Sequence, residues 1–401
     1  MKSYDVKIDV KKVFTLQPAR PITYFGVTAI NKIEDIVKDL RNKGHGKFLV
    51  VTDKVAYKAC GAWDVVKPVL EKESEGFEHY DSVRPNPTYD NCEEAAQIGS
   101  KANANAIIAI GGGSVIDTAK TAAVLMFHPG KKAVEFYEKG EEIKGALPIV
   151  AINTAHGTGS ETDAFAVAQS DGHDKPLINS PHIYPTYSID DPELTLTLPL
   201  NQIISTSIDA VNHSTEAATT ITTNPYSISL AKEAISLVAT YLPQAIVEPK
   251  NIIPRYWLMY ASAIAGISFD IGLLHITHSM EHAMSALNPE VIHGDGLGIL
   301  LPAIIKEIYH AVPEVLASLY HPIVPELKGL PGEGDYAVEK IRKWFNSVGQ
   351  STSMKKYFSE NDIPKLVKMT KESMLGKILL PLAPITVNDD VLTRIFKESM
   401  L

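Results

Sequence analysis

Four residues in the second half of the chain have the types and spacing of metal ligands: Asp209, His213, His278 and His293. Asp209 and His213 stand four residues apart in an amphipathic run, so a helix would present the carboxylate and the imidazole on one face. Taken alone, this pair is better explained as a buried polar pair in an ordinary capped helix. A metal site becomes the better interpretation only if further ligands converge with it.

A group of histidines further along the chain supplies such ligands. His275, His278 and His282 share one helix face at positions i, i+3 and i+7, inside an apolar context. Three imidazoles on one stripe are costly in a core and typical of a functional site. His293 follows beside Gly294, where the backbone is permissive. One carboxylate with three neutral imidazoles suits Fe²⁺ or Zn²⁺ and leaves a position open for water or substrate. His275, one turn before His278, is an alternative ligand.

The first half of the chain carries a glycine-rich loop. Residues 106–110 are typical of a buried strand, and Gly111-Gly112-Gly113-Ser114 lead from it into a helix that we expect to begin near Ser114. Bare backbone lets a pyrophosphate approach, and the unpaired N–H groups at a helix start attract negative charge. Ile116 stands where the usual dinucleotide fingerprint has its third glycine. A simple strand-to-helix turn therefore explains these glycines about as well as a phosphate site does.

Polar residues follow two other expected strands. Asp53 comes after the strand at 48–51, at the carboxyl edge where open α/β sheets bind ligands. Its carboxylate can accept the adenosine ribose hydroxyls and would repel a 2′-phosphate, which favours NAD over NADP. The alternative is an N-cap for the next helix. The segment from Thr154 to Glu161, rich in hydroxyls and glycine, follows a third strand on the same edge.

The length of the chain and its hydrophobic pattern indicate how its domains are organised. A chain of 401 residues exceeds the roughly 250–300 residues at which single cores stop growing, so we expect two domains. Apolar strands alternate with amphipathic helices up to about Leu194, and helical periodicity dominates beyond it. We expect an α/β dinucleotide-binding domain at 1–194 and an all-α metal-binding domain at 195–401.

Several classes of partner and location are disfavoured. The net charge is −9 and no Lys/Arg block stands out, so a nucleic-acid partner is not expected. No stretch reaches the roughly 18 apolar residues of a membrane helix, and the start lacks the apolar core of a secretory signal. Two cysteines are too few for a disulfide framework, so we expect a cytoplasmic location.

The motifs together resemble those of the iron-containing (group III) alcohol dehydrogenase family. The matching segments run in the family's order over nearly the whole chain: Pro85-Asn86-Pro87-Thr88, Gly111-Gly112-Gly113-Ser114-Val115-Ile116-Asp117, Gly157-Thr158-Gly159-Ser160-Glu161, Lys175-Pro176-Leu177, Asp191-Pro192-Glu193-Leu194-Thr195, Asp209-Ala210-Val211-Asn212-His213, residues 278–294 and Pro384-Ile385-Thr386. The resemblance implies the fold of dehydroquinate synthase-like, iron-dependent alcohol dehydrogenases, and a homodimer or larger homo-oligomer.

The resemblance also implies roles for individual residues. Those that would bind the metal, Fe²⁺ or another divalent ion, are Asp209, His213, His278 and His293. Those that would bind NAD are Asp53, Asn86, Gly112, Gly113, Ser114, Thr154, Thr158, Lys175 and Leu194. His282 matches a family histidine beside nicotinamide and substrate, and it is our candidate catalytic proton relay because an imidazole titrates near neutral pH.

The expected function is hydride transfer between NAD(H) and a small alcohol or diol whose oxygen the metal activates. Two alternatives stay open on the residues alone. His278-Ser279-Met280-Glu281-His282 also fits the H-x-x-E-H pattern of metallohydrolases, although that function would leave the nucleotide loops unused. A relative of glycerol or polyol dehydrogenases is the other alternative.

Overall fold

The structure is a computed structural model and describes residues 21–170 and 174–401. Its contacts divide the chain into two compact units. The first unit runs to Leu198 and also includes Lys250–Met259, and the second contains Pro199–Pro249 and Tyr260–Leu401. Residues 250–259 thus return to the first unit, so one boundary in the sequence cannot describe both units. The predicted division at Leu194 stays a prediction.

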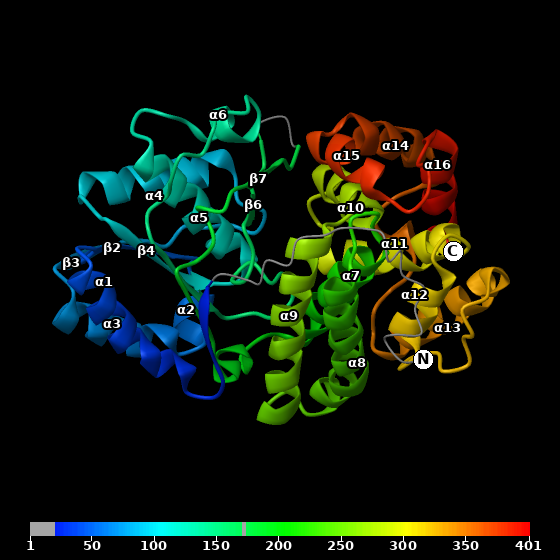
Figure 1. The fold of residues 1–401 in the computed structure, drawn as a ribbon, viewed down its shortest axis with the longest axis horizontal. Helices are drawn as coiled ribbons and strands as arrows, with labels where there is room; N and C mark the ends of the chain where they lie inside the picture. The colour runs from blue at the N-terminus through cyan, green and yellow to red at the C-terminus, as the bar shows by residue number, and fades with distance from the viewer. Residues whose placement is uncertain (1–20, 171–173) are drawn as a thin grey trace. The chain divides into compact units, whose positions relative to one another are not determined.

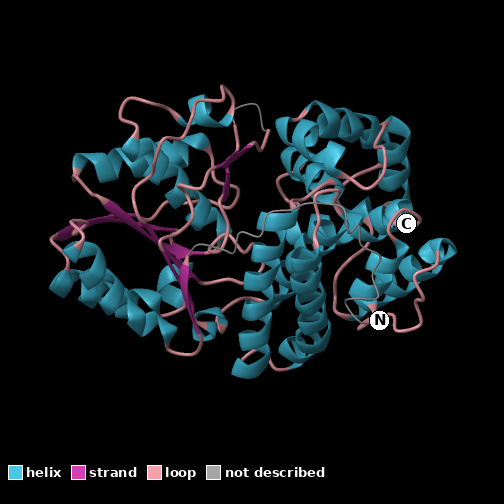
Figure 2. Ribbon diagram, viewed as in Figure 1, coloured by secondary structure: helices cyan, strands magenta, loops and turns pink. Residues whose placement is uncertain are grey.

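The first unit is built on a parallel sheet, which confirms the predicted α/β fold class (Figure 2). Its strand order is β1-β8-β5-β4-β2-β3, and every neighbouring pair in it is parallel. A separate antiparallel pair joins β6 to β7. The strands are β1 (Ile22–Phe25), β2 (Lys47–Thr52), β3 (Gly76–Tyr80), β4 (Ala106–Gly111), β5 (Ile149–Asn153), β6 (Phe165–Val167), β7 (Leu177–Asn179) and β8 (Tyr187–Asp190).

Helices cover both faces of this sheet. Leu49 and Val51 of β2 belong to the core that α4 and α5 complete, whereas Phe48 and Val50 belong to the core on the α1 and α3 side. Successive residues of one strand are therefore buried on opposite faces, which explains why the strands are apolar throughout. The helices of this unit are η2 (Ala29–Lys32), α1 (Ile33–Asn42), α2 (Ala56–Ala59), α3 (Ala62–Glu73), α4 (Tyr89–Lys101), α5 (Gly113–Phe127), α6 (Ala133–Tyr137) and η3 (Pro192–Thr195).

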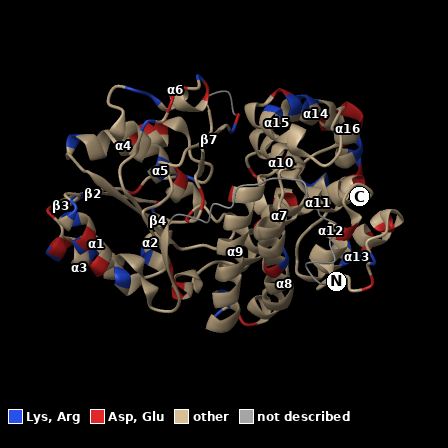
Figure 3. Cartoon of the chain, in the orientation of Figure 1, with Lys and Arg blue, Asp and Glu red and all other residues tan. Residues whose placement is uncertain are grey.

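Acidic and basic residues are interspersed along α1 and α3 (Figure 3). Lys38 and Lys72 both contact Glu34, at 2.6 and 3.3 Å. Exposed pairs of this kind each contribute little to stability. Their consequence is a solvated outer face of mixed charge on these two helices.

The second unit is helical in the part of the chain that the structure describes (Figure 1). Helix α9 (Ile252–Gly272) begins in the first unit and continues into the second. The other helices are α7 (Leu200–Thr219), α8 (Pro225–Val247), α10 (Ile276–Leu287), α11 (His293–Ile308), α12 (Pro313–Tyr320), η4 (Pro331–Glu333), α13 (Gly334–Ser347), η5 (Met354–Lys356), η6 (Glu360–Asp362), α14 (Ile363–Glu372), α15 (Met374–Leu379), η7 (Leu380–Leu382) and α16 (Asp389–Glu398).

No single helix among the described residues is long and apolar enough to cross a membrane. Helices α9 and α10 meet the length and composition criteria only when taken together, and they are bent by 108° at the break between them.

Three helices converge where the candidate ligands lie: α7, α10 and α11 pack against one another. The start of α11 approaches α7 very closely at Gly294. A Cβ added there would lie 2.0 Å from the backbone oxygen of Ser205 on α7, far inside van der Waals contact. Because a backbone atom cannot yield as a side chain can, this position admits only glycine. The close approach brings the first residue of α11, His293, toward the ligand-bearing face of α7.

Gly294→Ala should therefore destabilise the second unit by roughly the 1–3 kcal/mol typical of overpacking, with a fall in melting temperature. Differential scanning calorimetry measures this effect. Gly332→Ala is the matched control, since a Cβ at Gly332 would meet nothing within 4 Å. Equal melting temperatures for the two variants would contradict the close packing of α11 on α7.

Candidate metal centre and dinucleotide site

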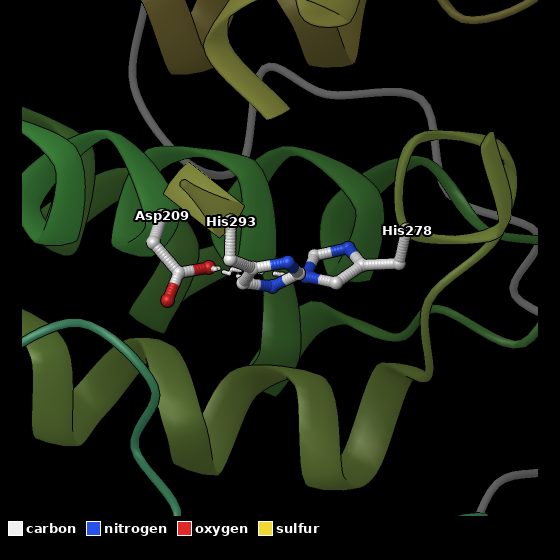
Figure 4. A group of neighbouring side chains, drawn as sticks. All are labelled: Asp209, His278 and His293. Atoms are coloured by element: carbon white, nitrogen blue, oxygen red, sulfur yellow. Dashed lines mark ion pairs between the residues drawn. The ribbon is translucent and has the colours of Figure 1, made fainter. Parts of the chain in front are cut away.

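Three of the four predicted metal ligands converge in the helical unit. Asp209 lies on α7, His278 on α10 and His293 at the start of α11, and their side chains point toward one another (Figure 4). Asp209 Oδ1 is 3.8 Å from His278 Nε2 and 3.9 Å from His293 Nε2. One ligand atom from each residue lies within 4.8 Å of the other two.

His213, the fourth predicted ligand, lies beside this group. Its Nδ1 is 3.5 Å from Asp209 Oδ1, as expected for residues one helical turn apart. Its ring stacks between two others, at 4.6 Å from His278 and 4.5 Å from Phe269 of α9, measured between ring centroids. The ring position of His213 is therefore held by packing, and burial lowers its pKa to about 4, which keeps the imidazole neutral.

The donor atoms fit a divalent cation. Asp209 Oδ1 and His278 Nε2 are buried and have no hydrogen-bond partner in the protein. Separations of 3.8 and 3.9 Å exceed a hydrogen bond yet are shorter than two metal–ligand bonds of about 2.1 Å, so one ion can contact both atoms. Buried polar atoms without partners are costly, and an ion between them removes that cost.

The charges around this group also favour a cation. Burial by itself lowers the pKa of His278, but the Glu216 and Asp209 carboxylates outweigh it and raise that pKa to about 10. Burial likewise opposes ionisation of Asp209, yet the surrounding imidazoles of His213, His278 and His293 hold its pKa below its usual range. A positive charge is thus stabilised at His278, and a metal ion there would supply one.

Two further carboxylates lie behind the ligand imidazoles. Glu216 Oε2 accepts a hydrogen bond from His278 Nδ1, and Glu281 Oε2 accepts one from His293 Nδ1. A carboxylate only accepts, so both imidazoles donate from Nδ1, and Nε2 on the side of Asp209 is the atom that can bind an ion in place of a proton. Sequence reasoning did not find Glu216, although its spacing of seven residues from Asp209 and three from His213 places all three on one helix face.

His275 does not belong to the group that can share an ion. It is the N-cap residue of α10, and its Nδ1 accepts a hydrogen bond from Ile276 N at 2.7 Å. Its Nε2 is 2.9 Å from Thr219 Oγ1, and burial lowers its pKa to about 4. The expectation of three histidines on one helical stripe is therefore wrong at His275, because α10 begins only after it.

His282, the candidate proton relay, lies one turn after His278 on α10. Its ring centroid is 5.6 Å from that of His293 and 6.5 Å from that of His278. It can also be grouped with Glu281 and His293 by ligand-atom distance. The Nδ1 atom of His293 is already bonded to Glu281, so that second grouping competes with an existing hydrogen bond.

In the α/β unit, four of the predicted dinucleotide residues lie at one edge of the sheet. They follow the carboxyl ends of four adjacent parallel strands: Asp53 follows β2, Gly112 follows β4, Thr154 follows β5 and Leu194 follows β8. From β2 the chain proceeds to β3 on one side and then crosses to β4 on the other. The edge between β2 and β4 is thus a topological switch point, where open α/β sheets bind ligands.

The glycine loop meets the Thr154–Glu161 segment in close packing. A Cβ on Gly113 would lie 2.6 Å from Thr158 Cγ2, and one on Gly112 would lie 3.3 Å from Ala155 Cβ. Helix α5 begins at Gly113, one residue before the predicted start, and its N-cap Gly112 supplies no side-chain hydrogen bond. The first N–H groups of α5 are therefore suited to an anion.

Buried polar contacts hold the Thr154–Glu161 segment against α5. Lys120 is fully buried and forms a 2.7 Å ion pair with Asp163, and its Nζ also donates to Ser160 Oγ at 3.1 Å. Ser160 Oγ in turn donates to Asp117 Oδ1 at 2.6 Å. Sequence reasoning did not identify Lys120 or Asp163, since single charged residues on helix or loop carry no distinguishing spacing.

The remaining predicted dinucleotide residues have local roles in the structure. Asp53 Oδ1 accepts hydrogen bonds from Val55 N and Ala56 N, both at 2.6 Å, so it closes the turn before α2, whose N-cap residue is Val55 and not Asp53. Lys175 is nearly buried and donates to Asn86 Oδ1 at 3.0 Å. Ser114 is the second residue of α5. Their contacts with a cofactor stay predictions.

Comparisons with known proteins agree with this arrangement. Residues 21–192 match the model of the iron-containing alcohol dehydrogenase family, and residues 203–400 match its C-terminal domain. The long-chain primary alcohol dehydrogenase AdhA of Thermoanaerobacter ethanolicus is 49% identical over 99% of this chain and 100% of its own length. The NAD-dependent methanol dehydrogenase of Bacillus methanolicus is 27% identical over 88% of this chain and 92% of its own.

Solved structures give the same result for the fold. The NADH-dependent butanol dehydrogenase A of Thermotoga maritima superposes with a TM-score of 0.86 at 26% identity, covering 97% of this chain and 98% of its own. The family match assigns the His278–His282 segment to an alcohol dehydrogenase, not to a hydrolase. The chain belongs to the iron-containing alcohol dehydrogenase family and is an NAD-dependent, metal-containing alcohol dehydrogenase.

Proposed function

We propose that this chain oxidises primary alcohols to aldehydes with NAD⁺, and reduces aldehydes in the reverse direction, at a divalent metal held by Asp209, His213, His278 and His293. The observation that carries the proposal is the convergence of Asp209 Oδ1 with the Nε2 atoms of His278 and His293. Asp209 Oδ1 and His278 Nε2 are also buried without a hydrogen-bond partner, which supports a cation between them.

We propose Fe²⁺ as the ion. One carboxylate and three imidazoles suit Fe²⁺ as well as Zn²⁺, and the name of the family supports iron. When bound, the ion would act as a Lewis acid on the oxygen of the alcohol or aldehyde. Asp209 would contribute the negative charge that moderates the ion, and the neutral imidazoles of His213, His278 and His293 would leave a position free for that oxygen.

His282 would move the proton in this reaction. Oxidation removes a hydride from the alcohol carbon to nicotinamide and a proton from the hydroxyl group, and the proton needs an acceptor. His282 lies beside His293 and is partly accessible, so its imidazole can take the proton and release it to water. In aldehyde reduction the same imidazole would return the proton.

The α/β unit would bind the dinucleotide. The first N–H groups of α5 and the bare backbone at Gly112 and Gly113 suit the pyrophosphate. Asp53 uses Oδ1 for the turn before α2, and its second oxygen suits the adenosine ribose. We propose contacts also from Asn86, Ser114, Thr154, Thr158, Lys175 and Leu194. The negative charge of Asp53 supports NAD over NADP.

We propose primary aliphatic alcohols and their aldehydes as substrates, small alcohols and diols included. The name of the relative at 49% identity supports primary alcohols, and the buried ring of Phe269 beside His213 supports an alkyl group near the metal. We further propose a homo-oligomer, which the resemblance to the family implies. We also propose a cytoplasmic location, which agrees with the free thiols of Cys60 and Cys92.

His278→Ala should remove the bound metal and the alcohol dehydrogenase activity together, because it deletes a ligand that faces Asp209. Metal content is measured by elemental analysis and activity by NADH absorbance. His310→Ala is the control, since His310 is exposed in the same helical unit and lies outside the ligand group. A His278→Ala protein that is free of metal yet fully active would refute the proposal.

Asp53→Asn should relax the preference for NAD. The amide oxygen still accepts the bonds from Val55 and Ala56, while the charge that repels a 2′-phosphate is gone. We expect kcat/KM with NADP to rise at least tenfold relative to that with NAD, about 1.4 kcal/mol. Asp64→Asn on the exposed face of α3 makes the same charge change elsewhere and should leave the ratio unaltered. An unchanged ratio in Asp53→Asn would mean that Asp53 serves only the turn.

A series of primary alcohols from ethanol to 1-octanol, together with 1,3-propanediol and glycerol, tests the substrate class. We expect kcat/KM to rise with alkyl length, since each buried methylene contributes about 0.8 kcal/mol. Peptide hydrolysis without any nucleotide should be undetectable. Faster turnover of glycerol or 1,3-propanediol than of 1-butanol would instead favour the polyol dehydrogenase alternative.

A further inference from the structure

Behind the predicted ligands lie two buried carboxylates that no ligand role uses, Glu216 on α7 and Glu281 on α10. We propose that both are positioning residues of the metal site: they fix the tautomer and ring orientation of His278 and His293 and bind the ion more tightly by doing so. The inference rests on the ligand set of the proposed function.

Glu216 satisfies three donors with two oxygens. Its Oε1 accepts from His275 N at 3.0 Å and Thr277 N at 2.7 Å, and its Oε2 accepts from His278 Nδ1. The backbone bonds attach the start of α10 to α7, and the imidazole bond orients His278. One side chain therefore sets both the position of the ligand helix and the direction in which its ligand nitrogen points.

Glu281 orients the predicted ligand of α11. It lies on α10, three residues after His278, and accepts from Nδ1 of His293 at the start of α11. Gly296 on α11 makes room for it, because a Cβ there would lie 2.8 Å from Glu281 Cγ. The imidazole on α10 is thus oriented by a carboxylate from α7, and the imidazole on α11 by a carboxylate from α10.

The two carboxylates also act through charge. A bond from Nδ1–H to a carboxylate increases electron density at Nε2, which makes the nitrogen a stronger ligand. Glu216 is fully buried, and its Oε2 is in hydrogen-bond contact with His278 Nδ1, so the carboxylate acts on this ring directly. Loss of such an outer carboxylate typically weakens metal binding by about 10–100-fold.

Glu216→Gln and Glu281→Gln test the proposal. An amide offers one acceptor and one donor, so glutamine at position 216 can satisfy either the two backbone N–H groups or the imidazole, but not both. We expect the Kd for Co²⁺, measured by chelator competition, to rise about 10–100-fold in each variant. We also expect the visible spectrum of the Co²⁺-loaded protein to shift, because the ligand field depends on ring orientation and nitrogen basicity. A purely structural role would change neither property in folded protein.

Thr219→Val is the matched control. It removes the hydroxyl that bonds to His275 within the same buried network but touches no predicted ligand. Its Kd for Co²⁺ and its spectrum should equal those of the unmodified protein, even if its melting temperature falls. Circular dichroism of the metal-free proteins shows whether each variant is folded. Should Glu216→Gln fail to fold, Glu281→Gln decides, since the bond from His293 Nδ1 to Glu281 is separate from the two backbone bonds that attach the start of α10 to Glu216.

Failure of this inference is distinguishable from failure of the proposed function. If both glutamine variants bind Co²⁺ with unchanged Kd and spectrum while His278→Ala loses it, the positioning roles are wrong and the ligand set stands. If His278→Ala binds Co²⁺ as tightly as the unmodified protein does, the ligand set itself is wrong, and the proposed function fails with it.

Discussion

The structure of the helical unit depends on one electrostatic constraint: buried polar atoms of Asp209 and His278 face one another without a hydrogen bond between them. Asp209 Oδ1 and His278 Nε2 lie 3.8 Å apart, and both lack a hydrogen-bond partner in the protein. In a core that served stability alone, apolar side chains would occupy this space, because they pack without leaving buried polar atoms unpaired. This arrangement lowers the stability of the fold. A positive charge between the two atoms, from a proton or a cation, removes that cost.

The packing of the helices follows from this constraint. The predicted ligands lie on three helices, so α7, α10 and α11 must meet within the length of a few side chains. Gly294 permits the close approach of α11 to α7, and Glu216 fixes the start of α10 against α7 through two backbone hydrogen bonds. The same residues that close the gaps between helices therefore also direct the ligands, so stability and chemistry are coupled at this point.

The sequence patterns correctly predicted the α/β fold class and the end of β4, but they did not predict that α10 begins only after His275. Strands buried on both faces are continuous apolar runs, and the glycine turn after residues 106–110 marks the end of β4 and the beginning of α5 within one residue. His275 shares the spacing of His278 and His282, but spacing cannot reveal that the chain turns at Leu273, where φ is 68°, before α10 begins. Glu216 was detectable by its helical spacing. The bond from Glu281 to His293 was not, because it joins two helices whose packing only the folded chain defines.

The balance of charge explains why a divalent ion suits this shell better than a proton does. Asp209, Glu216 and Glu281 bring three carboxylates to the imidazoles of His213, His278 and His293. A proton on His278 offsets one of these charges, and it then occupies the nitrogen that faces Asp209. A dication offsets two and leaves the nitrogens as ligands. An imidazole would separate each outer carboxylate from a bound ion, so Glu216 and Glu281 would retain their hydrogen bonds while adding to its stabilisation. Without Glu216 and Glu281, only packing would orient the rings of His278 and His293, as it orients the ring of His213 between Phe269 and His278.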